Sequence, residues 1–157
     1  MNTTTERLDS LDIQILRALQ QNARLSVKEL AAHVNRSSTP VYERMRRLEN
    51  GGYIKKYVAV LDAEKLNQGF IVFCNVKLNK ITHRFTECFA ERVLEIPQVS
   101  ECYNISGNYD FLLKIHAPDM KYYRDFVLDV LGTIDNVGSV ESVFVMDVVK
   151  CDYALHI

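Results

Sequence analysis

The segment from Thr39 to Asn50 carries Arg44, Arg46 and Arg47 among apolar residues that recur at helical spacing. Projection at about 100° per residue gathers the apolar side chains in one arc, which holds Val41, Met45 and Leu48. The opposite side is polar and holds Thr39, Glu43, Arg46 and Asn50, flanked by Tyr42 and Arg47. A guanidinium donates two hydrogen bonds to the O6 and N7 atoms of guanine or clamps a phosphate, so this side has the chemistry to bind DNA. We therefore expect Arg46 to contact bases and Arg47 to contact phosphate.

An ordinary solvent-exposed helix face is the other interpretation of the same arginines. Arg44, Arg46 and Arg47 would then pair with Glu43 and Glu49 along one helix. For a lone helix this is the more frequent outcome, so the neighbouring segments decide between the two interpretations.

A shorter helix is predicted directly before the arginine-bearing one. Ser26 and Glu29 form an S-x-x-E capping box, in which each side chain satisfies a backbone N–H of the first turn. One face of this helix is apolar and holds Val27, Leu30, Ala31 and Val34. Asn35 tolerates the left-handed conformation that ends a helix. The next helix has two candidate caps and a proline in its first turn, namely Ser37 or Thr39 and then Pro40.

The connecting turn is therefore three or four residues long, as a helix-turn-helix requires, and this favours the DNA-binding interpretation. The residues expected to contact DNA lie in the turn and on the polar side of the second helix: Arg36, Ser37, Ser38, Thr39, Tyr42, Glu43, Arg46 and Arg47. Charge agrees with this placement. Residues 1–60 hold ten Lys/Arg and six Asp/Glu, a net charge of +4, whereas the remainder holds nine and fourteen, a net charge of −5. Only the first part is expected to meet a polyanion such as double-stranded DNA.

Two further elements frame this pair of helices. Asp9 or Ser10 caps a leading helix, whose apolar face includes Ile13, Leu16 and Leu19. After Gly51-Gly52, residues 53–61 are predicted as a strand, which serves as a wing or as a hinge. Lys55 and Lys56 suit either a phosphate contact or a solvated edge.

From residue 70 the pattern becomes strand, helix, strand, and then repeats. The predicted elements are a strand at 70–79, a helix capped by Thr82, a strand at 99–105, a turn at 107–110, a strand at 111–116, a helix capped by Asp119 and a strand at 140–149. Two βαβ units of similar length imply a ferredoxin-like sheet with both helices on one face. The other face keeps apolar side chains such as Val143 and Val145, and a second copy of the chain is the expected cover.

Other residue types point away from catalysis and metal binding. The cysteines, Cys74, Cys88, Cys102 and Cys151, show no C-x-x-C spacing, and a reducing cytosol fits them best. The histidines lack metal-ligand spacing, so no metal site is expected. No paired carboxylates, activated nucleophile or phosphate loop indicates an enzyme. With no run of 18 apolar residues and no signal-peptide core near Met1, we expect a cytoplasmic protein without a membrane partner.

The residues of the first part resemble the signature of the Lrp/AsnC family, the leucine- and asparagine-responsive "feast/famine" transcription regulators. The matching positions are Leu8-Asp9, Asp12, Ile15-Leu16, Leu19-Gln20, Asn22-Ala23-Arg24, Ser26, Glu29-Leu30-Ala31, Ser37, Pro40-Val41, Arg44, Arg46-Arg47-Leu48-Glu49 and Gly52-Tyr53-Ile54. In the second part, residues 106–113 resemble the family's Gly-x-x-Asp effector turn. The resemblance covers nearly the whole chain and implies an α+β fold: a winged helix-turn-helix at 1–52, a connecting strand or hinge at 53–62, and a βαββαβ ligand-binding and oligomerisation domain at 63–157.

The resemblance also implies a homodimer, commonly assembled into an octamer, and a small amino acid as effector; no other cofactor is expected. The residues it places at the effector site are Tyr103, Ser106, Gly107, Asn108, Tyr109, Asp110, Thr133, Asp135, Val137 and Ser139. A glycine turn exposes backbone N–H and C=O groups that suit a zwitterion. Asp110 either pairs with the ammonium group or holds the turn. Arg36, Ser38 and Asn108 depart from the family's usual residues.

The leading functional hypothesis is an amino-acid-responsive, sequence-specific DNA-binding transcription regulator. The alternative is a DNA-organising, nucleoid-type protein of the same fold with no small-molecule effector.

Overall fold

The computed structural model describes residues 7–157, which form two compact units. The first holds the described residues up to 60 together with 150–157, and the second holds residues 61–149. Each unit has its own hydrophobic core. Residues 150–157 group with the first unit by their contacts, whereas the sequence places them in the second domain.

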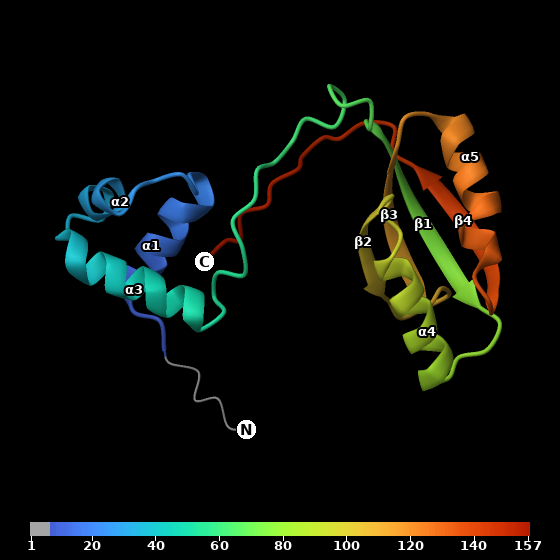
Figure 1. Ribbon diagram of the computed structural model, residues 1–157, viewed down its shortest axis with the longest axis horizontal. Helices are drawn as coiled ribbons and strands as arrows, with labels where there is room; N and C mark the ends of the chain where they lie inside the picture. Colours follow the sequence, from blue (N-terminus) through green and yellow to red (C-terminus); the bar gives the residue numbers. More distant parts are fainter. Residues whose placement is uncertain (1–6) are drawn as a thin grey trace. The chain divides into compact units, whose positions relative to one another are not determined.

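Three helices build the first unit: α1 (Ser10–Gln21), α2 (Val27–His33) and α3 (Ser38–Asn50) (Figure 1). Asp9 is the cap of α1, since its carboxylate accepts the N–H groups of Leu11 and Asp12. Ser26 and Glu29 form the predicted capping box of α2. The core between the helices contains Ile15, Leu30, Val41 and Leu48, each 1 % exposed or less. The apolar arc expected on α3 is thus the side that packs.

The turn between α2 and α3 has the predicted backbone. Asn35 adopts the left-handed conformation, with φ of 53°, and its N–H donates to the carbonyl of Ala32. Ser37 occupies the cap position of α3, although its side chain makes no capping hydrogen bond. Pro40 lies in the first turn of the helix, as expected.

The strand predicted at 53–61 is wrong for this chain. The N–H groups of Tyr53 and Ile54 both donate to the carbonyl of Leu48, which continues the end of α3 instead of starting a ladder. The residues that follow have strand-like composition, but no neighbouring segment among the described residues pairs with them as a strand. A strand needs such a partner, which composition cannot supply.

The second unit is a four-stranded antiparallel sheet with two helices. Its elements are β1 (Phe70–Leu78), α4 (His83–Leu94), β2 (Val99–Asn104), β3 (Phe111–Ala117), α5 (Met120–Asp129), the short 3₁₀ helix η1 (Leu131–Thr133) and β4 (Val137–Phe144). The strand order β2-β3-β1-β4 is that of a ferredoxin-like βαββαβ fold, and both helices cover the same face. The predicted fold class is confirmed.

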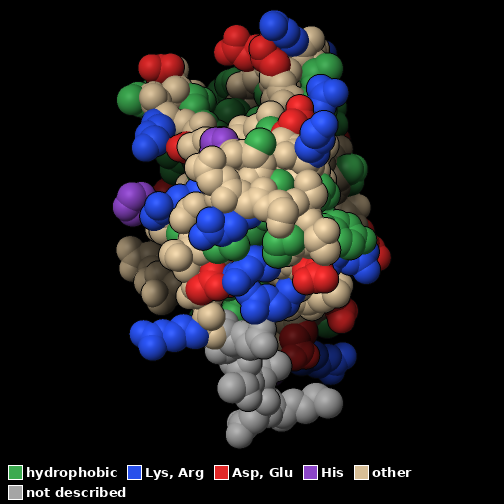
Figure 2. Space-filling view, turned by 90° about the vertical axis from the view of Figure 1, so that its left-hand side faces the viewer, with side chains coloured by type: hydrophobic (Ala, Val, Ile, Leu, Met, Phe, Trp, Pro, Cys, Tyr) green, Lys and Arg blue, Asp and Glu red, His purple; other side chains and the backbone are tan. Residues whose placement is uncertain are grey.

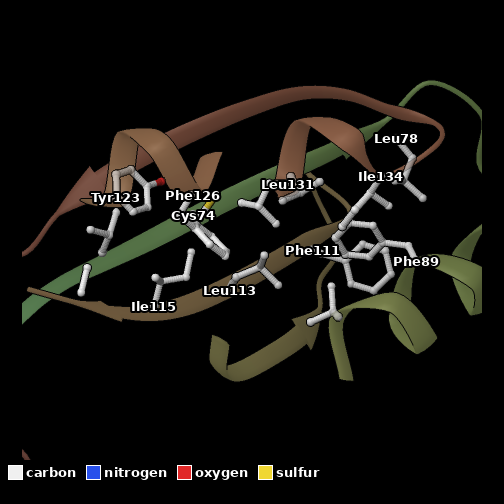
Figure 3. Packing of buried hydrophobic residues seen from close by; sticks show 14 residues of the cluster. Cys74, Leu78, Phe89, Phe111, Leu113, Ile115, Tyr123, Phe126, Leu131 and Ile134 are labelled. Atoms are coloured by element: carbon white, nitrogen blue, oxygen red, sulfur yellow. The ribbon is translucent and has the colours of Figure 1, made fainter. Parts of the chain in front are cut away.

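Alternate strand residues and one face of each helix form the core of this unit (Figure 3). Phe89 of α4 packs on Phe111 of β3 with ring centroids 4.5 Å apart. Tyr123 of α5 packs edge-on against Phe144 at 5.8 Å. Its hydroxyl also lies 2.6 Å from the Ser142 hydroxyl, so the one polar group of this ring is satisfied.

Strand β4 begins and ends earlier than the predicted span of 140–149. Phe144 lies opposite Val72, and the N–H of Val145 still donates to the carbonyl of Ile71. Because β1 starts at Phe70, the residues after Val145 have almost no backbone left to pair with. Hydrophobic composition alone therefore extended the prediction too far.

The sheet face opposite the helices carries both apolar and polar side chains. Cross-strand pairing places Phe73 beside Val143, and Val143 is 48 % exposed. The polar residues form pairs: Lys114 contacts Glu101 at 2.9 Å, and Asn75 donates to Glu141 at 3.4 Å. Among residues 7–157, no helix is long and apolar enough to cross a membrane.

Candidate functional site

A buried carboxylate fixes the orientation of α3. Asp12 on α1 is 0 % exposed, and one of its oxygens accepts from Arg44 at 2.8 Å while the other accepts from Arg47 at 2.6 Å. Arg44 also reaches the cap residue Asp9 at 2.6 Å. Two arginines of α3 are thus tied to the first turn of α1. Removing either side of such a buried pair is costly, because the charge left behind has lost its partner.

Protonation equilibria at this junction favour the charged forms. The pKa of Asp9 lies below its ordinary value because the backbone N–H of Asp12 and then the Arg44 guanidinium stabilise the carboxylate. The pKa of Arg44 is raised, first by Asp9 and then by Asp12. Asp9 and Arg44 therefore remain ionised across the physiological pH range.

These contacts change the interpretation of the arginine cluster. Arg44 and Arg47 bond to α1, and Glu49 accepts instead from the hydroxyl of Tyr57 at 3.0 Å. The alternative interpretation, in which glutamates of the same helix pair with the arginines, is therefore not what orients Arg44 and Arg47. Arg47 remains 45 % exposed while bonded to Asp12, so its outer part still faces solvent.

The polar side of α3 is open. Arg46 is exposed and makes no hydrogen bond or ion pair with any described residue. A shallow depression runs along this side and is lined by Tyr42, Glu43, Arg46, Arg47, Asn50 and Gly51. Figure 2 shows the molecule from the side of the first unit, where Lys and Arg side chains gather in groups with fewer acidic ones among them. The predicted contact residues in the turn, Arg36, Ser37, Ser38 and Thr39, are all exposed at the start of α3.

Asp110, at the predicted effector turn, already has two partners within the chain. One carboxylate oxygen accepts the N–H of Leu78 at 2.8 Å, and the other lies 3.3 Å from Lys77 Nζ. The Asp110 side chain is 12 % exposed, and its carbonyl accepts from Ile105 and Asn104. Of the two roles considered for Asp110, this geometry supports holding the turn against the end of β1.

The turn itself exposes backbone donors. Within residues 7–157, the N–H groups of Ser106, Gly107, Asn108 and Tyr109 donate to no acceptor of the chain. Gly107 has φ of +117°, a conformation that side-chain-bearing residues rarely adopt. Successive unpaired N–H groups in such a turn form a concavity suited to an anion such as a carboxylate.

The other predicted effector residues lie at the same end of the sheet. Val137 pairs with Leu78 and Ser139 with Lys77, on the side of β1 opposite the Asp110 contact. Asn136, at φ of 70°, holds both backbone groups of Lys80 through its side-chain amide. The two remaining candidates on this side are exposed, namely Thr133 at the end of η1 and Asp135.

Two tyrosines among the effector candidates are bonded to glutamates of the open sheet face. Tyr103 donates to Glu101 at 2.6 Å, and Tyr109 donates to Glu141 at 2.7 Å. The pKa of each tyrosine is raised, first by its glutamate acceptor. Both hydroxyls thus remain protonated donors.

Sequence reasoning missed the residues that position others. Asp12 was noted only for its resemblance to the family signature, yet its spacing from Ile15 and Leu19 puts a carboxylate on an apolar helix face, which signals a buried partner. Lys77 and Asn136 carried no comparable signal, because their roles depend on backbone groups distant in sequence. No group of three His, Cys, Asp or Glu side chains within residues 7–157 is arranged to hold a metal ion.

A helix-turn-helix with an open arginine-bearing helix, joined to a ferredoxin-like unit, defines a two-domain DNA-binding protein. Residues 8–55 match the family model for a winged helix-turn-helix DNA-binding domain, and residues 71–155 match the Lrp/AsnC ligand binding domain. The chain therefore belongs to the Lrp/AsnC family of transcription regulators.

Relatives with known names are similar over nearly their full length. The Bkd operon transcriptional regulator of Pseudomonas aeruginosa is 39 % identical over 88 % of this chain and 91 % of its own. The leucine-responsive regulatory protein of Klebsiella pneumoniae is 37 % identical over 91 % of this chain and 87 % of its own. A transcriptional regulator from Neisseria meningitidis, solved in complex with L-Met, superposes with a TM-score of 0.91 at 35 % identity, covering 96 % and 97 % of the two chains.

Proposed function

We propose that this regulator binds specific double-stranded DNA sites through α3 and that a small amino acid alters its DNA binding or assembly. The DNA-binding part of the proposal is supported by the different contacts that the arginines of α3 make. Arg44 and Arg47 hold α3 against α1, while Arg46 projects from the same helix without a partner among the described residues. A helix fixed in this way presents its free guanidinium at a defined angle to a major groove.

Within this proposal, Arg46 contacts base edges. The exposed part of the Arg47 guanidinium contacts a phosphate, while Arg47 keeps its hydrogen bond to Asp12. The exposed turn residues Arg36 to Thr39 contact the backbone at the start of the helix. Arg46→Ala should lower affinity for a selected site by about 1–3 kcal/mol and change binding to scrambled DNA little.

Salt-titrated binding to selected and scrambled duplexes measures this difference. Arg84→Ala is the matched control, because Arg84 is an exposed arginine on α4 in the other unit. Equal losses on both duplexes would show that Arg46 contacts phosphate and not bases.

The effector part of the proposal rests on the exposed N–H groups of the 106–109 turn. These donors suit the carboxylate of an amino acid. The relatives agree in chemistry, since one is a leucine-responsive regulatory protein and another was solved in complex with L-Met. We assign Asp110 to positioning the turn, because both of its oxygens are already engaged.

A thermal-shift screen against the twenty amino acids tests for the effector, because ligand binding to the native state raises apparent stability by mass action. Gly107→Ala should abolish the ligand-induced shift. Gly52→Ala is the matched control: Gly52 also has positive φ, at +74°, with open space around it, but lies after α3. If no amino acid shifts the melting temperature, the effector part fails and the DNA-organising alternative without a ligand remains.

The proposal includes self-association into a homodimer, with an octamer as the expected larger assembly. The sheet face that carries Phe73 and Val143 supplies the apolar surface for it. Two helix-turn-helix units related by a two-fold axis would then read a palindromic site.

A further inference from the structure

The side chain of Gln20 on α1 holds the main chain of the C-terminal segment. Its Nε2 donates to the carbonyl of Leu155 at 3.1 Å, and its Oε1 accepts the N–H of Leu155 at 2.5 Å. One amide group thus satisfies both backbone groups of a single residue, as a neighbouring β-strand would. This two-point contact fixes which residue of the segment meets α1.

Arg17, one helical turn earlier on α1, holds a second residue of the segment. Its Nε donates to the main-chain oxygen of Ile157 at 2.7 Å, and its Nη2 bonds to the same atom. Arg17 and Gln20 lie on one side of the helix, three residues apart, while Leu155 and Ile157 lie on one side of an extended chain, two residues apart. One side of α1 therefore presents two side chains to alternate residues of the segment.

Apolar contacts accompany these hydrogen bonds within the first unit. A groove of about 580 Å³ lies between α1, residues 53–60 and the C-terminal segment. The segment contributes Tyr153, Leu155 and Ile157 to its lining, and α1 contributes Ile13, Leu16, Leu19 and Gln20. Leu155 is still 74 % exposed, so the polar contacts carry much of the attachment.

The segment is continuous with the strand that begins at the proposed effector end. Strand β4 starts at Val137 and pairs with β1 as far as Val145, and residues 146–149 then connect it to residues 150–157. On the other side, α1 holds α3 through Asp12. A continuous path therefore connects the effector residues to the recognition helix. It follows the backbone from β4 to the C-terminal segment, then the hydrogen bonds from this segment to α1, and then those from α1 to α3.

We propose that residues 150–157 form a latch, with Gln20 and Arg17 as its receptor, through which the regulatory unit controls the freedom of the DNA-binding unit. When the latch is docked, the helix-turn-helix is held for binding; when it is released, only residues 53–62 restrain it. Release lowers operator affinity, because ordering the freed unit on DNA then costs conformational entropy. The effect of the latch on DNA affinity without an amino acid does not depend on an effector, whereas transmission of an amino-acid signal rests on the proposed function.

Gln20→Ala in the full-length chain tests the latch, with Gln21→Ala as the matched control. Gln21 is the next residue of α1, is exposed and makes no hydrogen bond with the segment. Amide hydrogen exchange of a peptide covering 150–157 should accelerate about tenfold in Gln20→Ala, since two hydrogen bonds are lost, and should not change in Gln21→Ala. Operator affinity of Gln20→Ala should fall severalfold, with the melting temperature of the core nearly unchanged.

Two results would overturn the latch. One is exchange of 150–157 in the unsubstituted protein as fast as in an unstructured peptide; the other is accelerated exchange in Gln20→Ala with operator affinity unchanged. These readouts need no amino acid, so they separate the latch from the effector. Where an amino acid does alter operator affinity, its effect should shrink toward onefold in Gln20→Ala, and an undiminished effect would remove the latch from the signalling route.

Discussion

Asp12 places a fully buried carboxylate between two helices at the point where the recognition helix must be held still. Both of its oxygens accept charged hydrogen bonds from α3, and one also accepts the N–H of Asp9. Charge-assisted bonds of this kind are short and directional. They therefore set the rotation of α3 more narrowly than the apolar contacts of Val41 and Leu48 do.

Asp12→Asn should lower the free energy of unfolding by about 1–3 kcal/mol, because Arg44 and Arg47 lose the buried carboxylate that they share. Chemical denaturation followed by circular dichroism measures the change. Asp62→Asn provides the comparison, since Asp62 is 51 % exposed and pairs with Lys65 at 3.5 Å. An exposed pair contributes less than about 1 kcal/mol, so equal losses in the two variants would contradict the assigned role of Asp12.

Cys74 is the buried member of the four cysteines. It is 0 % exposed in the core of the second unit, and burial raises the pKa of its thiol to about 11. A thiol with a raised pKa stays protonated, and hence unreactive, until the pH approaches that value.

At pH 8, Cys74 should therefore resist alkylation in the native protein, whereas the exposed Cys88 and Cys151 should react. Mass spectrometry of peptides after timed treatment with iodoacetamide measures each site. Unfolding the protein in denaturant should bring Cys74 to the rate of the others. Rapid native labelling of Cys74 would mean that the β1 core opens readily.

At the scale of elements, the turn between α2 and α3 sets the geometry of the DNA-binding pair. Asn35 has φ of 53°, which most side chains disfavour and which glycine adopts at no cost. Asn35→Ala should destabilise the first unit by about 1–2 kcal/mol, and Asn35→Gly should be close to neutral.

Thermal unfolding of the two variants, together with binding to a selected duplex, checks this prediction. The alanine variant should lose both stability and affinity, since the angle between the helices depends on the turn. Equal stability of the alanine and glycine variants would show that backbone strain at Asn35 is negligible.

Elements marked by local chemistry were predictable from the sequence, and those that depend on a distant partner were not. Ser26 and Glu29 predict the start of α2, because both partners of the capping box lie within four residues of each other. Thr82 and Asp119 likewise cap α4 and α5 as predicted. The strand at 53–61 and the overlong β4 failed because pairing requires backbone supplied from elsewhere in the fold.

The candidate site divides in the same way. The exposed side of α3 follows from helical periodicity, so Tyr42, Glu43 and Arg46 are found where the sequence placed them. The attachment of Arg47 to Asp12 and that of Asp110 to the N–H of Leu78 join residues more than thirty positions apart. No local pattern encodes such contacts, which is why the positioning roles appear only in the structure.

At the scale of the whole molecule, the open sheet face predicts self-association. Light scattering of the full-length protein should give a dimer or a larger assembly. Val143→Glu should reduce it to monomer, because the new carboxylate would be buried opposite Phe73 on the covered face.

Leu128→Glu is the control for this substitution. Leu128 is 65 % exposed on α5, which covers the other face of the sheet, so its variant should remain at least dimeric. A monomeric unsubstituted protein, or a dimer lost only in Leu128→Glu, would contradict the use of the open face.

We propose that this Lrp/AsnC protein combines sequence-specific DNA binding with a response to an amino acid. Selection of bound duplexes from a random DNA pool, with and without a mixture of the twenty amino acids, tests both halves at once. We expect a two-fold symmetric consensus whose enrichment changes when the mixture is present. Recovery of sequences without any consensus under both conditions would contradict it.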